Sequence, residues 1–339
     1  MSISNCKNVL DFCFAFYDNG FNRVAQSLHW GPGRGKWLDL FIIWENAMDL
    51  KCPLSIEEQV EKLKSHGVII NDEKKAKLLL QQVSYYRITG YTLQFRKSPT
   101  SSDLSSEHPL EEIHRIYEFD LKLRTILRHY IEINEVYYKA HISNIFSMEK
   151  CIEPPYDQHY YPENYYNKDG FNSTMERFQK EESYYSDSLI VKHHKQNYDG
   201  RMPLWVMFEL MSFSNVSMLY SAMYNSSQEA IAGALGIGCK TLANHLHCMS
   251  VLRNKCAHAA RLINTRYNPP AKLSKKFLRD NPSVSNDSLF AYIKVLLYRL
   301  PSDCLRDELK KQICCLINEY NDVVDLSLIG FPVNFKNLL

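Results

Sequence analysis

Apolar side chains recur at spacings of three and four residues through most of the chain from Ser55 onward. Such positions share one face of an amphipathic helix. Alternation of apolar and polar residues never extends beyond a few positions, so the pattern predicts an all-α protein. The predicted helices begin at Ser55 and at Asn71 (with Leu78, Leu79 and Leu80 inside), span 110–147 (with Leu121 on the apolar side) and 203–224, begin again at Gln228, and span 240–264, 287–300 and 304–322.

Composition divides the chain into three parts. Residues 1–47 hold a Gly-rich loop between aromatic stretches and are interpreted as an atypical N-terminal extension that is dispensable. Residues 48–100 are predicted to form an N-terminal helical region, because Ser55 and Glu58 after Met48 make a capping box at a helix start. Residues 110–339 are predicted to form a helical bundle with an insertion at 151–200 that contains eight tyrosines.

The charge of the chain is informative locally. The formal net charge is only +2, but residues 239–280 hold nine Lys/Arg and one acidic residue. A basic block of this kind is typical of a surface that binds phosphate groups. The aromatic cluster at residues 85–91 adds side chains able to stack on bases, with core packing as the alternative. The candidate RNA-binding residues are Tyr86, Arg87, Lys255, Arg261, Arg266, Lys272, Lys275 and Lys276.

The chain shows no membrane-spanning run, no secretory signal and no paired C-x-x-C cysteines. Ten scattered cysteines are best explained as free thiols in a reducing compartment. We therefore expect a cytoplasmic protein without a membrane partner, and no motif calls for a cofactor or a metal.

The segment from Arg253 to His258 carries the most chemistry. On a helix, Asn254 and His258 lie one turn apart on the same face, and Arg253 is long enough to approach that edge. His247, Ser250, Asn254, His258 and Arg261 continue this face as a polar stripe. Burying such a stripe without partners would be costly, so we expect it to line a cleft or an interface.

These residue types suit metal-free RNA cleavage. The RNA 2′-OH attacks the adjacent phosphate, a histidine moves the proton, and an arginine stabilises charge on the phosphoryl oxygens. Arg253, Asn254 and His258 are therefore the candidate catalytic residues, with His247 and Arg261 as supporting residues. Because acid and base catalysis together need two groups, one histidine per chain predicts a homodimer that pairs two copies of the helix.

Several further motifs, in a fixed order, carry a resemblance to a known family. They are residues 55–60 with Leu63 and Gly67; 85–87 with 90–91; 116–120 with 123–124; 203–206 with Glu209, Ser212 and Phe213; 252–254 with 256–258 and 261–262; and 329–332 with Asn334. Over most of residues 53–335 the chain resembles the abortive-infection (Abi-like, AbiD/AbiF-type) bacterial proteins of the HEPN superfamily of all-helical ribonucleases.

The resemblance implies a HEPN-like bundle, a dimeric composite site, and an endoribonuclease acting as an abortive-infection toxin in phage defence. It also implies RNA partners, namely the substrate and a structured non-coding RNA of a toxin–antitoxin system. The family tends to carry Glu and, four residues later, Arg on the long helix, where this chain has Glu135 and Lys139. Both are expected to support the site, although Lys139 lacks the planar guanidinium fork.

Three other interpretations remain open. Residues 231–246 resemble a helix-turn-helix, which would indicate a DNA-binding regulator. A zinc site could use His245, His247, Cys248, Cys256 and His258, although zinc ligands usually come in pairs from distinct elements. A HEPN module that binds RNA without cleaving it is the third.

Overall fold

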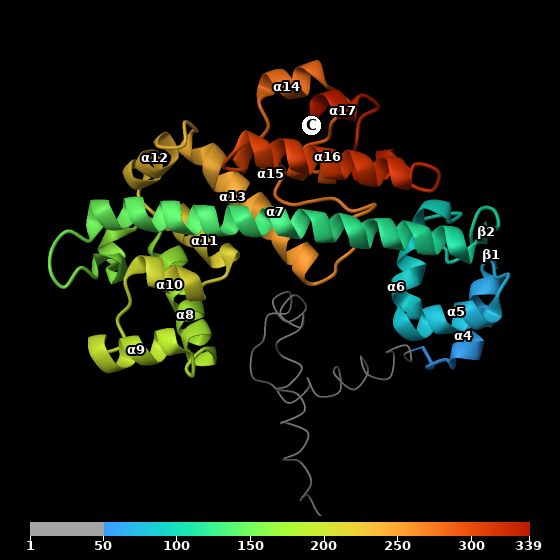
Figure 1. Cartoon of the computed structure of the whole chain (residues 1–339), viewed down its shortest axis with the longest axis horizontal. Coiled ribbons are helices and arrows are strands. Elements are labelled where there is room, and N and C mark those ends of the chain that lie inside the picture. The colour runs from blue at the N-terminus through green and yellow to red at the C-terminus, as the bar shows by residue number, and fades with distance from the viewer. Residues whose placement is uncertain (1–50) are drawn as a thin grey trace, which may run out of the picture. The chain divides into compact units, whose positions relative to one another are not determined.

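The computed structural model describes residues 51–339, of which Leu54–Leu339 form one compact unit. The extension predicted at residues 1–47 lies outside the described residues. Most of the described chain is helical, which confirms the all-α prediction (Figure 1). Within this part, strand structure is confined to isolated bridges and one short parallel pair, β1 (Val68–Ile69) and β2 (His108–Pro109).

Helix α7 (Leu110–Lys150) is the element against which most others pack. Its buried side chains, such as Ile116, Leu123 and Leu127, recur at helical spacing along its length. Leu121, expected on the apolar side, is exposed instead. A helix of 41 residues is about 60 Å long. One end therefore reaches the N-terminal helices and the other reaches the insertion (Figure 1).

The N-terminal part contains α4 (Ile56–Ser65), α5 (Glu73–Gln82), α6 (Tyr85–Thr89) and the 3-10 helix η1 (Gly90–Phe95). The predicted capping box is present, with the Ser55 hydroxyl accepting from the Glu58 N–H and the Glu58 carboxylate accepting from the Ser55 N–H. Helix α5 begins at Glu73 rather than Asn71, because Asp72 caps it. Leu80 is buried as predicted, but Leu78 is exposed, so three successive leucines do not share one face.

The Tyr-rich insertion is ordered around four helical segments: η2 (Gln158–Tyr160), η3 (Pro162–Asn164), α8 (Lys168–Tyr184) and α9 (Leu189–Tyr198). The prediction of a single helix over residues 203–224, which follow the insertion, is wrong. The chain forms α10 (Leu204–Leu210) and α11 (Phe213–Ala222), because the Ser212 hydroxyl accepts from the Asn215 N–H and starts a new helix.

Helix α12 (Asn225–Gly233) leads into α13 (Cys239–Ala257), which contacts α7, α11, α12 and α15. The remaining elements are α14 (Lys275–Asp280), α15 (Leu289–Arg299), α16 (Asp303–Glu319), η4 (Leu326–Ile329) and α17 (Phe335–Leu338). No helix in residues 51–339 is both long and apolar enough to cross a membrane.

The prediction that α13 continues to Asn264 is wrong. His258 is its C-cap, and Ala259 adopts a left-handed conformation with φ 51°. The Ala260 N–H donates to Lys255 O at 2.8 Å, and the Ala259 N–H donates to Cys256 O at 3.4 Å. This is a Schellman motif with alanine at the position that usually holds glycine. Without that glycine, the sequence carries no local stop signal.

Candidate functional site

The motif Arg253-Asn254-x-x-x-His258 lies at the C-terminal end of α13. Leu252 and Cys256 are buried within it, Arg253 and Asn254 are half-buried, and His258 is exposed. The backbone N–H of His258 donates to Asn254 O at 3.0 Å, so the two residues lie one turn apart as predicted. Burial raises the pKa of the Cys256 thiol to about 12, which leaves it unsuited as a nucleophile.

Glu135 links Arg253 to the long helix α7. One oxygen of its carboxylate lies 3.4 Å from Arg253 Nε, and the other lies 3.0 Å from Lys139 Nζ. The side chain of Asn254 donates to Ser214 Oγ on α11 at 3.1 Å. The structure therefore brings Glu135, Lys139 and Arg253 together, and Lys139 supplies the second cation where the family tends to have arginine.

His258 has different neighbours from those of Arg253. It lines a cavity of about 520 Å³ between the α6–η1 segment and the loop 258–265. We call this space the His258 cavity. Its charged and aromatic lining residues are Tyr86, Arg87, Tyr91, Arg96, His258 and Arg261. The expectation that the polar stripe lines a cleft holds for His258 and Arg261.

The other members of the stripe have separate environments. His247 is exposed, whereas Ser250 is buried and donates to His247 O at 2.9 Å. His245, also on α13, is buried beside Lys272 O at 2.9 Å. Burial lowers the pKa of His245 to about 4, so this histidine is neutral near pH 7.

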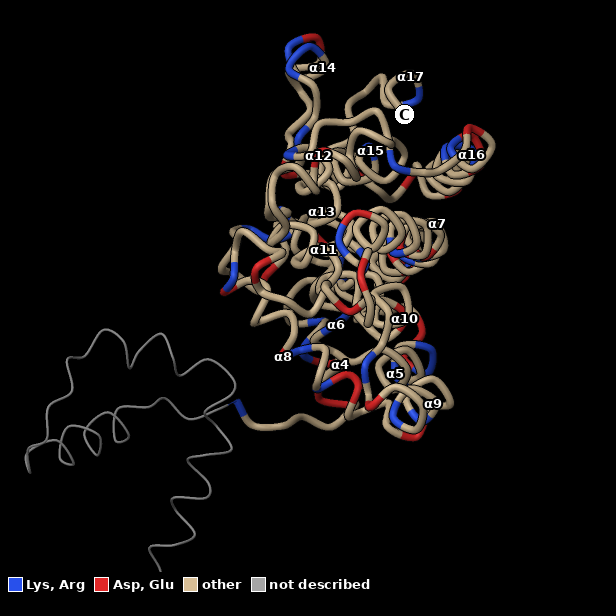
Figure 2. The backbone as a smooth tube through the Cα atoms, turned by 90° about the vertical axis from the view of Figure 1, so that its left-hand side faces the viewer, with Lys and Arg blue, Asp and Glu red and all other residues tan. Residues whose placement is uncertain are grey.

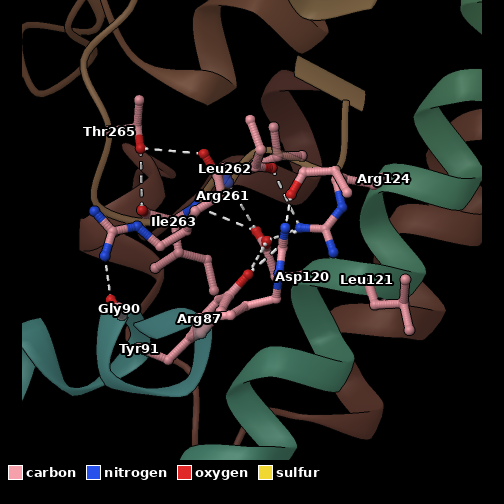
Figure 3. A network of polar contacts seen from close by, with 12 residues as sticks. Arg87, Gly90, Tyr91, Asp120, Leu121, Arg124, Arg261, Leu262, Ile263 and Thr265 are labelled. Carbon is pink, nitrogen blue, oxygen red and sulfur yellow. Dashed lines mark hydrogen bonds and ion pairs between the residues drawn. The ribbon is translucent and has the colours of Figure 1, made fainter. Parts of the chain in front are cut away.

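A buried polar network fixes the loop that follows His258 (Figure 3). One oxygen of the Asp120 carboxylate accepts from the Leu262 and Ile263 N–H groups at 3.0 and 3.2 Å. The other oxygen accepts from the Tyr91 hydroxyl at 2.7 Å and from the Arg124 guanidinium. Tertiary hydrogen bonds to α7 thus replace the helical ones that an extended α13 would have made.

The electrostatics of this network follow from its burial. Burial raises the pKa of the Asp120 carboxyl, while Arg124, Tyr91 and the two backbone N–H groups oppose that shift. Burial and the Asp120 charge raise the pKa of the Tyr91 phenol. Sequence reasoning missed the positioning role of Asp120, Arg124 and Tyr91. The signal was present, since all three belong to the motifs that carry the family resemblance.

The candidate RNA-binding residues fall into two groups. Arg87 and Arg261 line the His258 cavity, and Tyr86 stands exposed at it. Lys275 and Lys276 belong to α14, which Figures 1 and 2 place on the opposite side of α7 from α6. Lys272 instead contacts the start of α13, with Nζ 3.2 Å from Lys240 O. The basic block is therefore continuous in sequence but divided in space.

The last two candidates for RNA binding are engaged with other side chains. Lys255 Nζ lies 5.2 Å from the Tyr267 ring centroid, a cation–π distance. Arg266, which is largely exposed, pairs with Asp287 at 3.2 Å.

The packing of α13 weighs against the helix-turn-helix interpretation. A recognition helix needs polar side chains free to enter a DNA groove, but the Asn244 side chain near the start of α13 donates to Pro270 O at 3.0 Å and accepts from the Lys272 N–H at 2.7 Å. The five residues considered for zinc are also not gathered. Within residues 51–339, no group of three or more His, Cys, Asp or Glu is arranged to hold a metal ion.

Fold and site together define a mainly helical protein. The end of its helix α13 carries Arg253 and His258 and is held on the long central helix α7. A sequence model of the family described as Abi-like protein matches residues 78–264. The match covers more than half of the chain, and the chain belongs to this family. It includes α7, α13 and the Asp120 network, but not the similar motifs at 55–67 and 329–334. Comparisons with curated proteins and with solved structures gave no match.

Proposed function

We propose that this protein is a metal-independent endoribonuclease of the HEPN type that acts in abortive infection. Family membership supports the role in defence. The observation that carries the proposed activity is the placement of the motif at the end of α13. There, Glu135 holds the half-buried Arg253 at 3.4 Å, and His258 is exposed one turn further on.

The proposed reaction needs only the RNA and these side chains. The 2′-oxygen attacks the adjacent phosphorus and gives up its proton, while the bond from phosphorus to the 5′-oxygen breaks. The leaving 5′-oxygen takes up a proton, so the products are a 2′,3′-cyclic phosphate and a 5′-OH end. His258 transfers protons, and Arg253 neutralises charge that develops on the phosphoryl oxygens.

One chain supplies a single histidine to this reaction, so we propose that two copies act together. In each copy Arg253 is held by Glu135, which also pairs with Lys139, whereas His258 lines a cavity with other residues. A homodimer that pairs the ends of two α13 helices would bring a second histidine to the same phosphate. We further propose that a structured non-coding RNA restrains the activity.

The activity test uses the full chain, a single-stranded RNA and its DNA counterpart, with a chelator present throughout. Wild-type protein should cleave the RNA only and leave cyclic phosphate ends. His258→Ala should reduce the rate by about 100-fold or more, the usual contribution of a positioned proton-transfer group. His129→Ala serves as the matched control, because His129 is an exposed histidine on α7 that does not line the His258 cavity.

The outcomes separate the candidate functions. Equal cleavage by wild type and His258→Ala would show that this site is not responsible. RNA binding without cleavage would favour the non-catalytic RNA-binding module. Tight binding of a palindromic DNA duplex, with none to RNA, would favour the regulator. Light scattering on the same sample should give the mass of a dimer.

A further inference from the structure

The His258 cavity is built from two segments that are far apart in the sequence. Residues of α6 and η1 form one wall, and the loop 258–265 forms the other. The walls are joined directly, because Arg87 Nη1 donates to Ala259 O at 2.6 Å across 172 residues of sequence. In the opposite direction, Arg261 donates to Gly90 O (Figure 3).

Three arginines contribute to this cavity and each is held by neutral oxygens. Besides the two bonds just described, Arg96 donates to Thr89 O at 2.8 Å and to Thr92 Oγ1 at 3.1 Å. A guanidinium has five N–H donors, so these partners fix the side chains and leave most donors available. The rigid, planar guanidinium of an arginine can donate two parallel hydrogen bonds to the oxygens of a phosphate.

The positive charge of the cavity is not balanced by its own walls. No carboxylate lines it, and among the described residues Arg87, Arg96 and Arg261 form no ion pair with Asp or Glu. Elsewhere the same chain pairs its arginines, as in Arg124 with Asp120 and Arg115 with Asp322. Three unpaired guanidiniums around one space call for an anionic ligand.

Tyr86 indicates which anion. Its side chain is 88% exposed although it is a large aromatic residue that lines the cavity. Aromatic rings beside cationic grooves stack on the bases of single-stranded nucleic acid. A simple phosphate would use the arginines and leave this ring without a partner, whereas a nucleotide unit would use both.

We propose that the His258 cavity binds one nucleotide unit of a single-stranded RNA, with the phosphate on Arg87, Arg96 and Arg261 and the base on Tyr86. This inference rests on the proposed function in one respect, namely that the strand passing His258 is RNA. It adds a binding subsite separate from Arg253 and assigns a ligand contact to Arg96. The cavity volume is within the range of small-ligand sites, about 300–1,000 Å³.

The test measures binding rather than cleavage. The probe is a fluorescein-labelled single-stranded RNA whose 2′-hydroxyls are methylated, so that 2′-oxygen attack is blocked, and the full chain is titrated by anisotropy. Tyr86→Ala should weaken binding about tenfold, the effect of losing one stacked base, and Tyr86→Phe should retain the affinity. Tyr184→Ala is the control, because Tyr184 is an equally exposed tyrosine on α8, outside the cavity.

A second pair of variants tests the phosphate contact. Arg96→Ala should lower the salt dependence of binding, with the slope of log K against log salt falling by about 0.7 for one lost contact. Arg96→Lys should restore part of the affinity, because it keeps the charge but not the fork. Unchanged binding in both Tyr86→Ala and Arg96→Ala would overturn the proposal.

The remaining outcomes distinguish this inference from the proposed function. Loss of binding in both variants of a protein that never cleaves RNA would support the subsite and reject the nuclease. If Tyr86→Ala and Arg96→Ala both cleaved and bound RNA as wild type does, the nuclease would be supported and the subsite rejected. Competition by 3′-AMP identifies the source of the nucleotide: binding of 3′-AMP without affinity for the strand would overturn the proposal.

Discussion

Asp120–Arg124 and Glu135–Lys139 are both carboxylate–cation pairs at i, i+4 spacing on α7. They lie about four turns apart, and both hold the end of α13. Asp120 binds the backbone of the loop after it, and Glu135 binds Arg253 within it. The side chains of the first pair are 0% and 4% exposed, whereas those of the second are 13% and 12% exposed.

The difference separates positioning from chemistry. Every contact of Asp120 is to a group inside the protein, so this pair fixes where the chain goes after His258. Glu135 is shared by two cations that remain partly open to solvent, and a shared carboxylate leaves each cation able to bind a further anion. The buried Asp120–Arg124 pair therefore determines the path of the chain after His258. The cations bound to Glu135 and the exposed His258 remain available to a ligand.

Asp120→Asn tests the buried pair and should have the largest effect. Removing one partner of a buried ion pair typically costs about 3–5 kcal/mol, and the Leu262 and Ile263 N–H groups would also lose a charged acceptor. Urea unfolding should show this loss of free energy. Asp322→Asn, which breaks the exposed pair with Arg115, should cost at most about 1 kcal/mol. Equal losses in both variants would contradict the structural role of Asp120.

The histidines of α13 extend the comparison, because His245 is buried and His258 is exposed. The folded-state pKa of His245 is lowered from 6.5 to about 4. Between these values the unfolded chain binds a proton that the folded chain does not, so stability is full above pH 6.5 and falls as the pH approaches 4. At about 1.4 kcal/mol per pKa unit, the total is on the order of 3 kcal/mol.

His245→Gln should flatten the acid side of the stability curve, because glutamine does not titrate and still reaches Lys272 O. Urea unfolding at pH 4.5, 5.5 and 7 measures the slope for this variant and for wild type. His159, whose pKa burial also lowers to about 4, keeps part of the slope. His129→Gln is the exposed control, and a slope change in that variant alone would contradict the assignment to His245.

The features that sequence analysis predicted are those set by local rules. The capping box at Ser55 and the long helix from Leu110 depend on neighbours within a few residues, and both are confirmed. The end of α13 at Ala257 was missed because Asp120, which lies 142 residues before Leu262 in the chain, accepts a hydrogen bond from the Leu262 N–H. No window around Ala257 contains that information.

The candidate site divides in the same way. The spacing of Asn254 and His258 follows from helix geometry, and the association of Glu135 and Lys139 follows from the family pattern. The His258 cavity was not predictable, because Arg87, Arg96 and Arg261 meet only through tertiary contacts. The basic block suggested one surface, but α14 lies on the opposite side of α7 from α6 (Figures 1 and 2), and α6 contributes residues to the cavity.

Glu135→Gln tests the less buried pair, Glu135–Lys139, and should cost less stability than Asp120→Asn. The lost interactions are partly exposed to solvent, so we expect a cost of about 1 kcal/mol in urea unfolding. RNA cleavage should fall about tenfold, because Arg253 loses the charge that orients it. A loss as large as that of Asp120→Asn would remove the distinction between the two pairs.

Lys139→Arg is the matched comparison for that variant, since it restores the residue that the family tends to carry. Arginine keeps the charge and adds a planar fork able to bind the Glu135 carboxylate through two N–H groups. Stability should stay within about 0.5 kcal/mol of wild type, and cleavage should be equal or faster. If Lys139→Arg lowered cleavage as much as Glu135→Gln, Glu135 would act mainly through Lys139, and its contact with Arg253 would not be what orients the motif.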